Sequence, residues 1–161
     1  MEEVLKKLEE LNIQYELVKH PPVHTIEDMT NLDPSIFKGA EICKNLFLRD
    51  AKGKRHFLVI LCGDKQARMD KIQEQAYTTR LSFGSAERLQ KQLGLEAGYV
   101  SPMGLINNPQ KTVEVLLDKD IKKKEKLAFH PNTNEACVLI TYEDLKKFLD
   151  DCGHEVEFIT I

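Results

Sequence analysis

Cys43-Lys44-Asn45-Leu46-Phe47-Leu48-Arg49-Asp50-Ala51-Lys52-Gly53-Lys54-Arg55-His56-Phe57-Leu58-Val59-Ile60-Leu61 is the stretch of this sequence that decides its fold. Its two ends, residues 43–48 and 56–61, are apolar runs rich in the aromatic and branched side chains that favour strands. The link between them, residues 49–55, is polar and has a glycine near its tip, as hairpin loops commonly do. We therefore predict two strands joined by a hairpin.

Helices and further strands are predicted on both sides of this hairpin. Apolar residues recur at helical spacing or alternate as in a strand, and polar or Gly- and Pro-containing turns separate them. The two kinds of element mix without strict βαβ alternation, which predicts an α+β fold with a mixed or antiparallel sheet and helices outside it. The expected helices cover residues 2–11, 26–29, 70–76, 86–93 and 142–149, and the other strands cover residues 13–18, 112–117, 126–130, 135–141 and 155–159.

Several helix ends carry recognisable capping residues. Thr25, Ser85 and Thr141 each precede a predicted helix, and their hydroxyls can accept the free amide hydrogens of its first turn. Gly94 and Gly153 follow the last apolar residue of a helix, where glycine is common. The segment 98–104, with two glycines and a proline, is predicted to be a strand-to-loop element with unusual backbone geometry.

Length and composition bound the class of protein. A chain of 161 residues suits one domain, so we expect residues 1–161 to form a single unit with a core that needs no disulfide or metal. No apolar run approaches the roughly 20 residues that cross a bilayer, and the N-terminus lacks the pattern of a signal peptide. We expect a cytoplasmic protein with no membrane partner.

The charge of the chain argues against a DNA-binding protein, and the placement of its cysteines argues against a metal site. The net charge of −3 and the lack of a recognition motif argue against a DNA-binding protein, and the lysine clusters are interpreted as solvated surface. The four cysteines form no Cys-x-x-Cys pair and have no histidine at zinc-ligand spacing, so no metal site is expected. Cys62 and Cys137 are predicted to be core residues, and packing is also favoured for Cys43.

Three features could take part in catalysis or ligand binding, and each could also have a purely structural role. Lys44 and Asn45 interrupt an apolar strand, so one of them should point into a core or cleft, unless Lys44 snorkels from a strand edge. His130 ends a strand and is either an acid–base group or a histidine bonded to nearby backbone. The glycines of segment 98–104 could hold a ligand against backbone amides, or form only a tight turn.

Several of these segments occur together in an order that resembles a known family. Residues 44–50, 80–85, 98–105 and 129–134 follow one another, and His20-Pro21 and Thr25-Ile26-Glu27 precede them. This arrangement is similar to the YbaK and prolyl-tRNA synthetase editing (INS-like) domain family over nearly the whole chain. The extended start and the stretch Thr133–Val138 resemble the free-standing members that remove alanine from tRNA specific for proline.

The resemblance implies a fold and an activity. The fold would be α+β, with a central mixed, largely antiparallel sheet and flanking helices. The activity would be hydrolysis, in trans, of the ester that joins a small amino acid to the terminal ribose of tRNA, without cofactor or metal. The implied partners are the tRNA acceptor end and, transiently, an aminoacyl-tRNA synthetase.

The resemblance also implies roles for individual residues. Lys44 would anchor a phosphate or stabilise charge near the carbonyl, Asn45 would orient the substrate, and His130 would shape the far wall of the pocket. The backbone from Gly98 to Gly104 would hold the ester, with Gly104 among the catalytic positions. The remaining substrate-binding residues implied are Thr25, Ile26, Leu46, Ser101 and Met103.

Two alternatives to alanine editing stay open. The first is a deacylase for another small amino acid, such as cysteine, serine or threonine. The second is a protein without catalytic activity that keeps the fold and binds tRNA or an amino acid to regulate another process.

Overall fold

The computed structural model describes all residues from Met1 to Ile161. Its elements match the predicted order closely. The α-helices are α1 (Glu2–Glu10), α2 (Ile26–Thr30), α3 (Met69–Gln75), α4 (Ala86–Leu93) and α5 (Tyr142–Cys152). The strands are β1 (Glu16–Lys19), β2 (Glu41–Ile42), β3 (Lys44–Arg49), β4 (His56–Leu61), β5 (Ser82–Phe83), β6 (Val113–Asp118), β7 (Leu127–Phe129), β8 (Ala136–Ile140) and β9 (Val156–Ile159). The short 3₁₀ helices are η1 (Pro34–Phe37), η2 (Ala97–Tyr99), η3 (Pro102–Asn107) and η4 (Lys119–Lys123).

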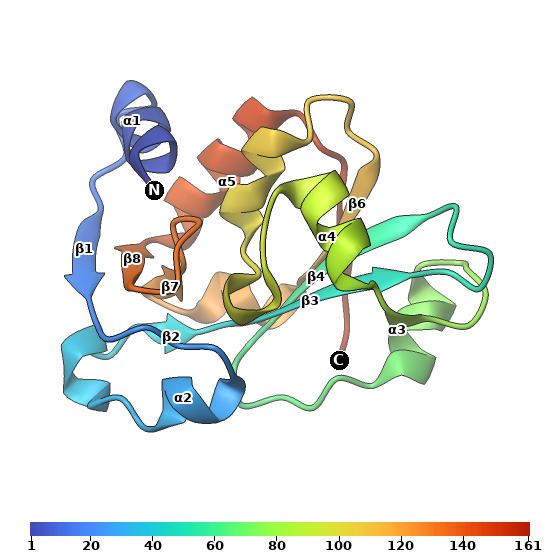
Figure 1. Ribbon diagram of the computed structural model, residues 1–161, viewed down its shortest axis with the longest axis horizontal. Helices are drawn as coiled ribbons and strands as arrows, with labels where there is room; N and C mark the ends of the chain where they lie inside the picture. Colours follow the sequence, from blue (N-terminus) through green and yellow to red (C-terminus); the bar gives the residue numbers. More distant parts are fainter.

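The strands form two mixed sheets, which confirms the predicted α+β class. One sheet has the order β1-β8-β7-β2, and the other has the order β5-β3-β4-β6-β9. Each contains antiparallel and parallel pairs: the β3–β4 hairpin is antiparallel, whereas β4 and β6 are parallel. The single central sheet expected from the sequence is thus divided in two. The division falls at Cys43, the one residue between β2 in the first sheet and β3 in the second (Figure 1).

Two apolar clusters pack against opposite faces of the β3–β4 hairpin. Successive side chains of a strand point to opposite faces, so Phe47 belongs to the larger cluster and Leu48 to the smaller one. The larger cluster joins both sheets, since it also contains Val138 of β8 and Phe148 of α5. The smaller cluster includes Ile72 of α3, the helix at the right of Figure 1. The hairpin is therefore buried on both faces, and every residue of β4 is buried.

The predicted helix caps are confirmed. Thr25 and Thr141 each accept a hydrogen bond from the amide three residues later and complete a capping box with Asp28 and Asp144. The Ser85 hydroxyl likewise accepts a hydrogen bond from the amide three residues later, that of Arg88. Gly94 and Gly153 end their helices with φ of 65° and 76°, the left-handed region that glycine adopts without strain.

The predicted strand-to-loop element at residues 98–104 is wrong. The segment forms η2 and the start of η3 instead, because Pro102 occupies the first turn of η3 and the Ser101 hydroxyl accepts the Met103 amide hydrogen at 3.1 Å. These are local helix-start signals. None of the helices is long and apolar enough to traverse a bilayer.

Candidate functional site

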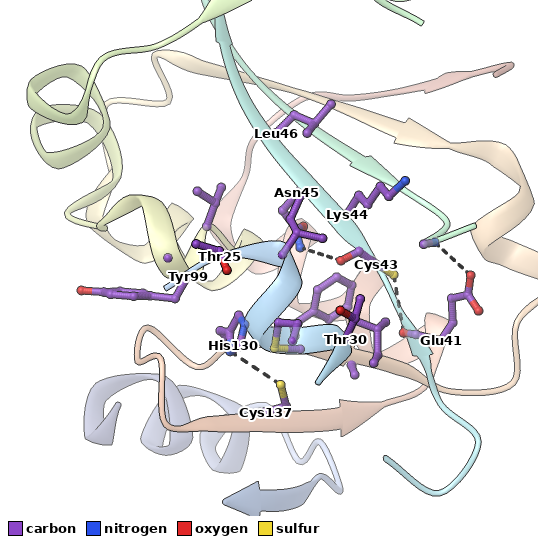
Figure 2. Close-up of a pocket in the computed structure, with 18 of the residues that line it drawn as sticks. Thr25, Thr30, Glu41, Cys43, Lys44, Asn45, Leu46, Tyr99, His130 and Cys137 are labelled. Carbon is purple, nitrogen blue, oxygen red and sulfur yellow. Dashed lines mark hydrogen bonds between the residues drawn. The ribbon is translucent and has the colours of Figure 1, made fainter. Parts of the chain in front are cut away.

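A pocket of about 530 Å³ opens at the junction where β2 passes into β3. Its walls come from α2, from the β2–β3 segment, from η2, and from β7 with the residue that follows it. The pocket therefore lies where the two sheets separate, and no single sequence segment contains it (Figure 2). Of the predicted site residues, those that line this pocket are Thr25, Ile26, Lys44, Asn45, Leu46, Gly98 and His130.

Lys44 lies at the edge of the pocket, on the same face of β3 as Leu46. Its Nζ donates a hydrogen bond to the carbonyl oxygen of Lys65, in the turn that follows β4. Figure 2 shows its side chain directed away from His130 and Cys137. Lys44 is thus a half-buried, tethered cation rather than a lysine that snorkels freely into solvent.

Asn45 occupies the opposite face of the strand, on the side of Thr25 and His130 in Figure 2. Its Nδ2 donates to the Cys43 carbonyl at 3.4 Å, whereas its buried Oδ1 has no hydrogen-bond partner. A buried carbonyl oxygen without a donor costs free energy. Such an atom beside a pocket is an acceptor ready for a donor group of a ligand.

His130 follows β7 and is fixed through one ring nitrogen. Its Nδ1 lies 2.9 Å from the Ala136 carbonyl oxygen and 3.6 Å from the Cys137 sulfur, so Nδ1 carries the hydrogen and the carbonyl accepts it. Nε2 then has a free lone pair and makes no hydrogen bond in the structure. Burial lowers the pKa of His130, and its bond to Ala136 only partly opposes this effect. The ring is therefore neutral near pH 7.

A second histidine completes a cluster behind His130. His20 Nδ1 donates to the Pro21 carbonyl at 2.9 Å, which leaves its Nε2 to accept the Cys137 thiol hydrogen at 3.6 Å. Burial raises the pKa of Cys137 to about 12, so the thiol keeps its hydrogen. The potential ligand atoms of His20, His130 and Cys137 all lie within 4.8 Å of one another. In the structure this cluster is a hydrogen-bonded chain, and the expectation of no metal stays a prediction.

Three of the predicted residues lie outside the pocket. Ser101 and Met103 are fully buried, and Met103 belongs to the larger apolar cluster. Gly104 packs against Leu95, where a Cβ would lie 2.5 Å from a leucine methyl carbon. Ser101, Met103 and Gly104 thus lie at the start of η3, outside the residues that line this pocket, and their part in substrate binding and catalysis stays a prediction.

Gly98 lies in the pocket wall, where a side chain would crowd the neighbouring backbone. A Cβ there would stand 3.0 Å from the Val23 carbonyl oxygen and 3.2 Å from His24 Cα. Both neighbours are backbone atoms, so they cannot give way cheaply. Gly98 thus allows η2 to pack directly on the segment that enters α2, and this contact closes one wall.

Several pocket residues are not among those predicted from the sequence, including Met29, Thr30, Glu41, Gly63 and Tyr99. Met29 and Thr30 follow Ile26 on a predicted short helix, so helical spacing could have indicated them. Glu41 and Gly63 carry no local signal, because they meet only when β2 lies beside the turn after β4; the Gly63 amide donates to Glu41 Oε1 at 3.0 Å. Cys43 is buried, and burial raises the pKa of its thiol, which agrees with a packing role.

The pocket can bind a polar ester without supplying a nucleophile. A tethered cation and an unpaired amide oxygen come from β3, a neutral histidine with a free lone pair comes from β7, and apolar groups such as Leu46 and Ile26 surround them. These groups can position a substrate and stabilise charge that develops on a carbonyl oxygen. The nearby thiols are protonated and bonded, so neither is an activated nucleophile.

Comparison with known proteins agrees with this geometry. The family model described as "Aminoacyl-tRNA editing domain" matches residues 20–148, which include every pocket residue. The chain belongs to the aminoacyl-tRNA editing domain family. This membership confirms the resemblance read from the motifs, and it confirms the predicted class of activity, the editing of aminoacyl-tRNA.

Relatives of this editing domain span nearly the whole chain. The prolyl-tRNA editing protein ProX of Acetoanaerobium sticklandii is 44% identical over 158 residues, covering 98% of this chain and 95% of that protein. The prolyl-tRNA synthetase associated domain-containing protein 1 of Mus musculus is 33% identical over 159 residues, covering 95% and 91%. The crystal structure of hypothetical protein APE2540 superposes with a TM-score of 0.71 and 17% identity, over 97% of both chains, and so shares the fold.

Proposed function

We propose that this editing domain acts in trans as a deacylase that removes alanine from tRNA specific for proline, with residues 1–161 forming one unit. The observation that carries the proposal is that Asn45 of β3 and His130, which follows β7 of the other sheet, line one pocket, with Lys44 at its edge. The 44% identity to a prolyl-tRNA editing protein supports the same choice of tRNA. A pocket of about 530 Å³ is large enough to hold an amino acid together with part of the terminal nucleoside.

Hydrolysis in this pocket needs only water as co-reactant. Water attacks the ester carbonyl carbon, the bond from that carbon to the ribose oxygen breaks, and the ribose oxygen takes up a proton. The products are free alanine and uncharged tRNA. Lys44 offers positive charge for the oxyanion or a phosphate, and His130 Nε2 can accept a hydrogen from the amino group, the water or the neighbouring ribose hydroxyl.

Specificity in this proposal comes from size. A hydrophobic pocket excludes a larger side chain more easily than it rejects a smaller one. Apolar residues of the lining, among them Leu46, Ile42 and Ala128, would accept a methyl group and leave less room for the pyrrolidine ring of proline. Serine, cysteine and threonine esters are the competing substrates. Contact with a synthetase and a cytoplasmic location are further parts of the proposal.

A panel of charged tRNAs tests this function. The purified chain is incubated with tRNA for proline carrying alanine, serine, cysteine, threonine or proline, and ester loss is followed over time. We expect rapid loss of alanine and little loss of proline. Lys44→Ala is the control, since loss of turnover with retained folding assigns the activity to this pocket. Turnover of another ester would replace the substrate, and absence of turnover by the native chain would favour a binding protein.

A further inference from the structure

Asp118 is a buried carboxylate that the proposed hydrolysis does not use directly. It ends β6 and its side chain is 0% exposed. Its Oδ2 accepts a hydrogen bond from the Cys62 amide at 3.1 Å, and its Oδ1 accepts from Lys65 Nζ at 2.8 Å and from the Asp120 amide at 3.0 Å. Lys65 Nζ also donates to Asp120 at 2.6 Å. A buried charge is tolerated only when it is paired in this way.

These bonds fasten the turn from Cys62 to Lys65 to the end of β6. Burial by itself raises the pKa of Asp118, but the bonds from Lys65 and the two amides outweigh it and hold the pKa below its ordinary value. Asp118 is therefore ionised and paired with Lys65 throughout the neutral range. The turn also closes on itself through a bond from the Lys65 amide to the Cys62 carbonyl at 3.2 Å.

The same turn is held from the side of the pocket. The Gly63 amide donates to Glu41 Oε1 at 3.0 Å, a contact drawn at Glu41 in Figure 2. A Cβ on Gly63 would overlap the Ile42 carbonyl oxygen, so only glycine allows the turn to approach β2 this closely. The turn is thus fixed between β2 and the end of β6, and Gly63 and Asp64 form part of the pocket lining.

The fixed turn holds the Lys65 carbonyl oxygen, which accepts a hydrogen bond from Lys44 Nζ. An ammonium group has three hydrogens, so this bond leaves two for a substrate oxygen. A free lysine side chain would sample many rotamers, and ordering it during the reaction would cost conformational entropy. We propose that Asp118 is a positioning residue for Lys44, acting through the Lys65 turn to hold the ammonium group at the pocket edge. This inference rests on the proposed role of Lys44 in deacylation.

A double-mutant cycle tests the coupling between these residues. Deacylation of alanyl-tRNA for proline is measured with the native chain, Asp118→Asn, Lys44→Ala and the double variant. Asparagine keeps an oxygen for the Cys62 amide and removes the charge that holds Lys65. We expect Asp118→Asn to lower kcat/KM by about 10-fold when Lys44 is present and by less than about 2-fold in the Lys44→Ala background. It should change the same parameter, kcat or KM, as Lys44→Ala does.

Asp50→Asn is the matched control. Asp50 is also a buried aspartate, 8% exposed, and it accepts the Lys54 and Arg55 amide hydrogens at 2.8 and 3.1 Å. It lies beyond the opposite end of β3, away from the pocket, so its loss should lower stability without the coupling to Lys44. Equal losses of kcat/KM from Asp118→Asn in both Lys44 backgrounds would overturn the inference, because a merely structural effect is independent of Lys44.

A second measurement needs no turnover and therefore separates this inference from the proposed function. Lysines are reductively methylated with a ¹³C label, and the Lys44 signal is assigned by its absence in Lys44→Ala. Asp118→Asn should move the Lys44 signal toward the position of a free lysine, and Asp50→Asn should leave it in place. An unmoved Lys44 signal in Asp118→Asn would contradict the positioning role even if the native chain proved inactive on every ester.

Discussion

At the scale of single residues, the site depends on the alternation of side chains along β3. Lys44 and Asn45 are neighbours in sequence, yet the strand pleat sends them to opposite faces. Lys44 finds a partner in the Lys65 carbonyl, whereas Asn45 keeps a buried oxygen without a donor. The fold therefore supplies a hydrogen-bond partner for Lys44, whereas the Asn45 oxygen remains an unpaired acceptor beside the pocket.

Asn45→Ala should lower the rate of deacylation while changing the stability of the fold only slightly. The substitution removes a buried amide whose Oδ1 is unpaired and whose one bond is long, so we expect the free energy of unfolding to change by no more than about 1 kcal/mol. Deacylation should fall, because an acceptor for the substrate is lost. Urea unfolding and the rate of ester loss measure the two effects. A loss of stability well above this value with full activity would contradict the prediction.

Asn108→Ala is the matched control for Asn45→Ala. Asn108 is more deeply buried than Asn45, at 3% exposed. Its Oδ1 accepts from the Val113 amide at 3.1 Å and lies 3.0 Å from His154 Nε2, and its Nδ2 donates to Thr112 at 2.8 Å. Its replacement leaves buried groups unpaired and should cost about 1–3 kcal/mol. Because Asn108 does not line the pocket, the folded variant should keep its activity.

At the scale of secondary structure, two helices with the same cap allow a direct comparison. Thr25 and Thr141 form equivalent capping boxes, but α2 contributes pocket residues and α5 does not. Replacing either threonine with alanine should destabilise its helix by about 0.5–2 kcal/mol. Only Thr25→Ala should reduce deacylation, since fraying of α2 displaces Ile26 and Met29 from the pocket wall. Hydrogen exchange of each helix and the rate of ester loss are the measurements, and equal losses of activity would refute the prediction.

At the scale of the whole molecule, two buried histidines, His56 and His154, and the half-buried His130 give stability a pH dependence. Burial is the main cause that lowers the pKa of His56, His130 and His154 in the folded chain. Below about pH 6.5, the ordinary histidine pKa, the unfolded chain therefore binds more protons than the folded chain. The free energy of unfolding should fall as the pH drops through that value and be restored above it.

Thermal melting at pH 7.5 and pH 5.5 checks this dependence. We expect a lower Tm at pH 5.5, because the histidines that are neutral in the fold gain protons on unfolding. Asp28 and Asp50 should not affect the difference in Tm between these two pH values. Hydrogen bonds lower the pKa of both carboxyl groups, so their contributions to stability are lost only in more acidic solution. An equal or higher Tm at pH 5.5 would show that carboxylates, rather than histidines, control stability in this range.

Most elements of this molecule could be predicted because their signals are local. The hairpin of β3 and β4, the caps Thr25, Ser85 and Thr141, and the terminal glycines of α4 and α5 each depend on a few neighbouring residues. The prediction for the segment after Gly98 is wrong, because its apolar and glycine content indicates a strand-to-loop element, whereas the short cap formed by Ser101 and Pro102 starts a 3₁₀ helix. Local signals also gave no account of how the strands divide between two sheets, because pairing joins residues far apart in the chain.

The sequence by itself determined most of the secondary structure, the mixed α+β class and, through ordered motifs, the editing family with Lys44, Asn45 and His130 as candidates. Only the tertiary structure decided which face each side chain takes and what meets it: the tether from Lys44 to Lys65, the unpaired oxygen of Asn45, and the exclusion of Ser101, Met103 and Gly104 from the pocket. The physical reason is that motifs report local backbone preference, whereas the pocket forms where two sheets separate and bring distant segments together.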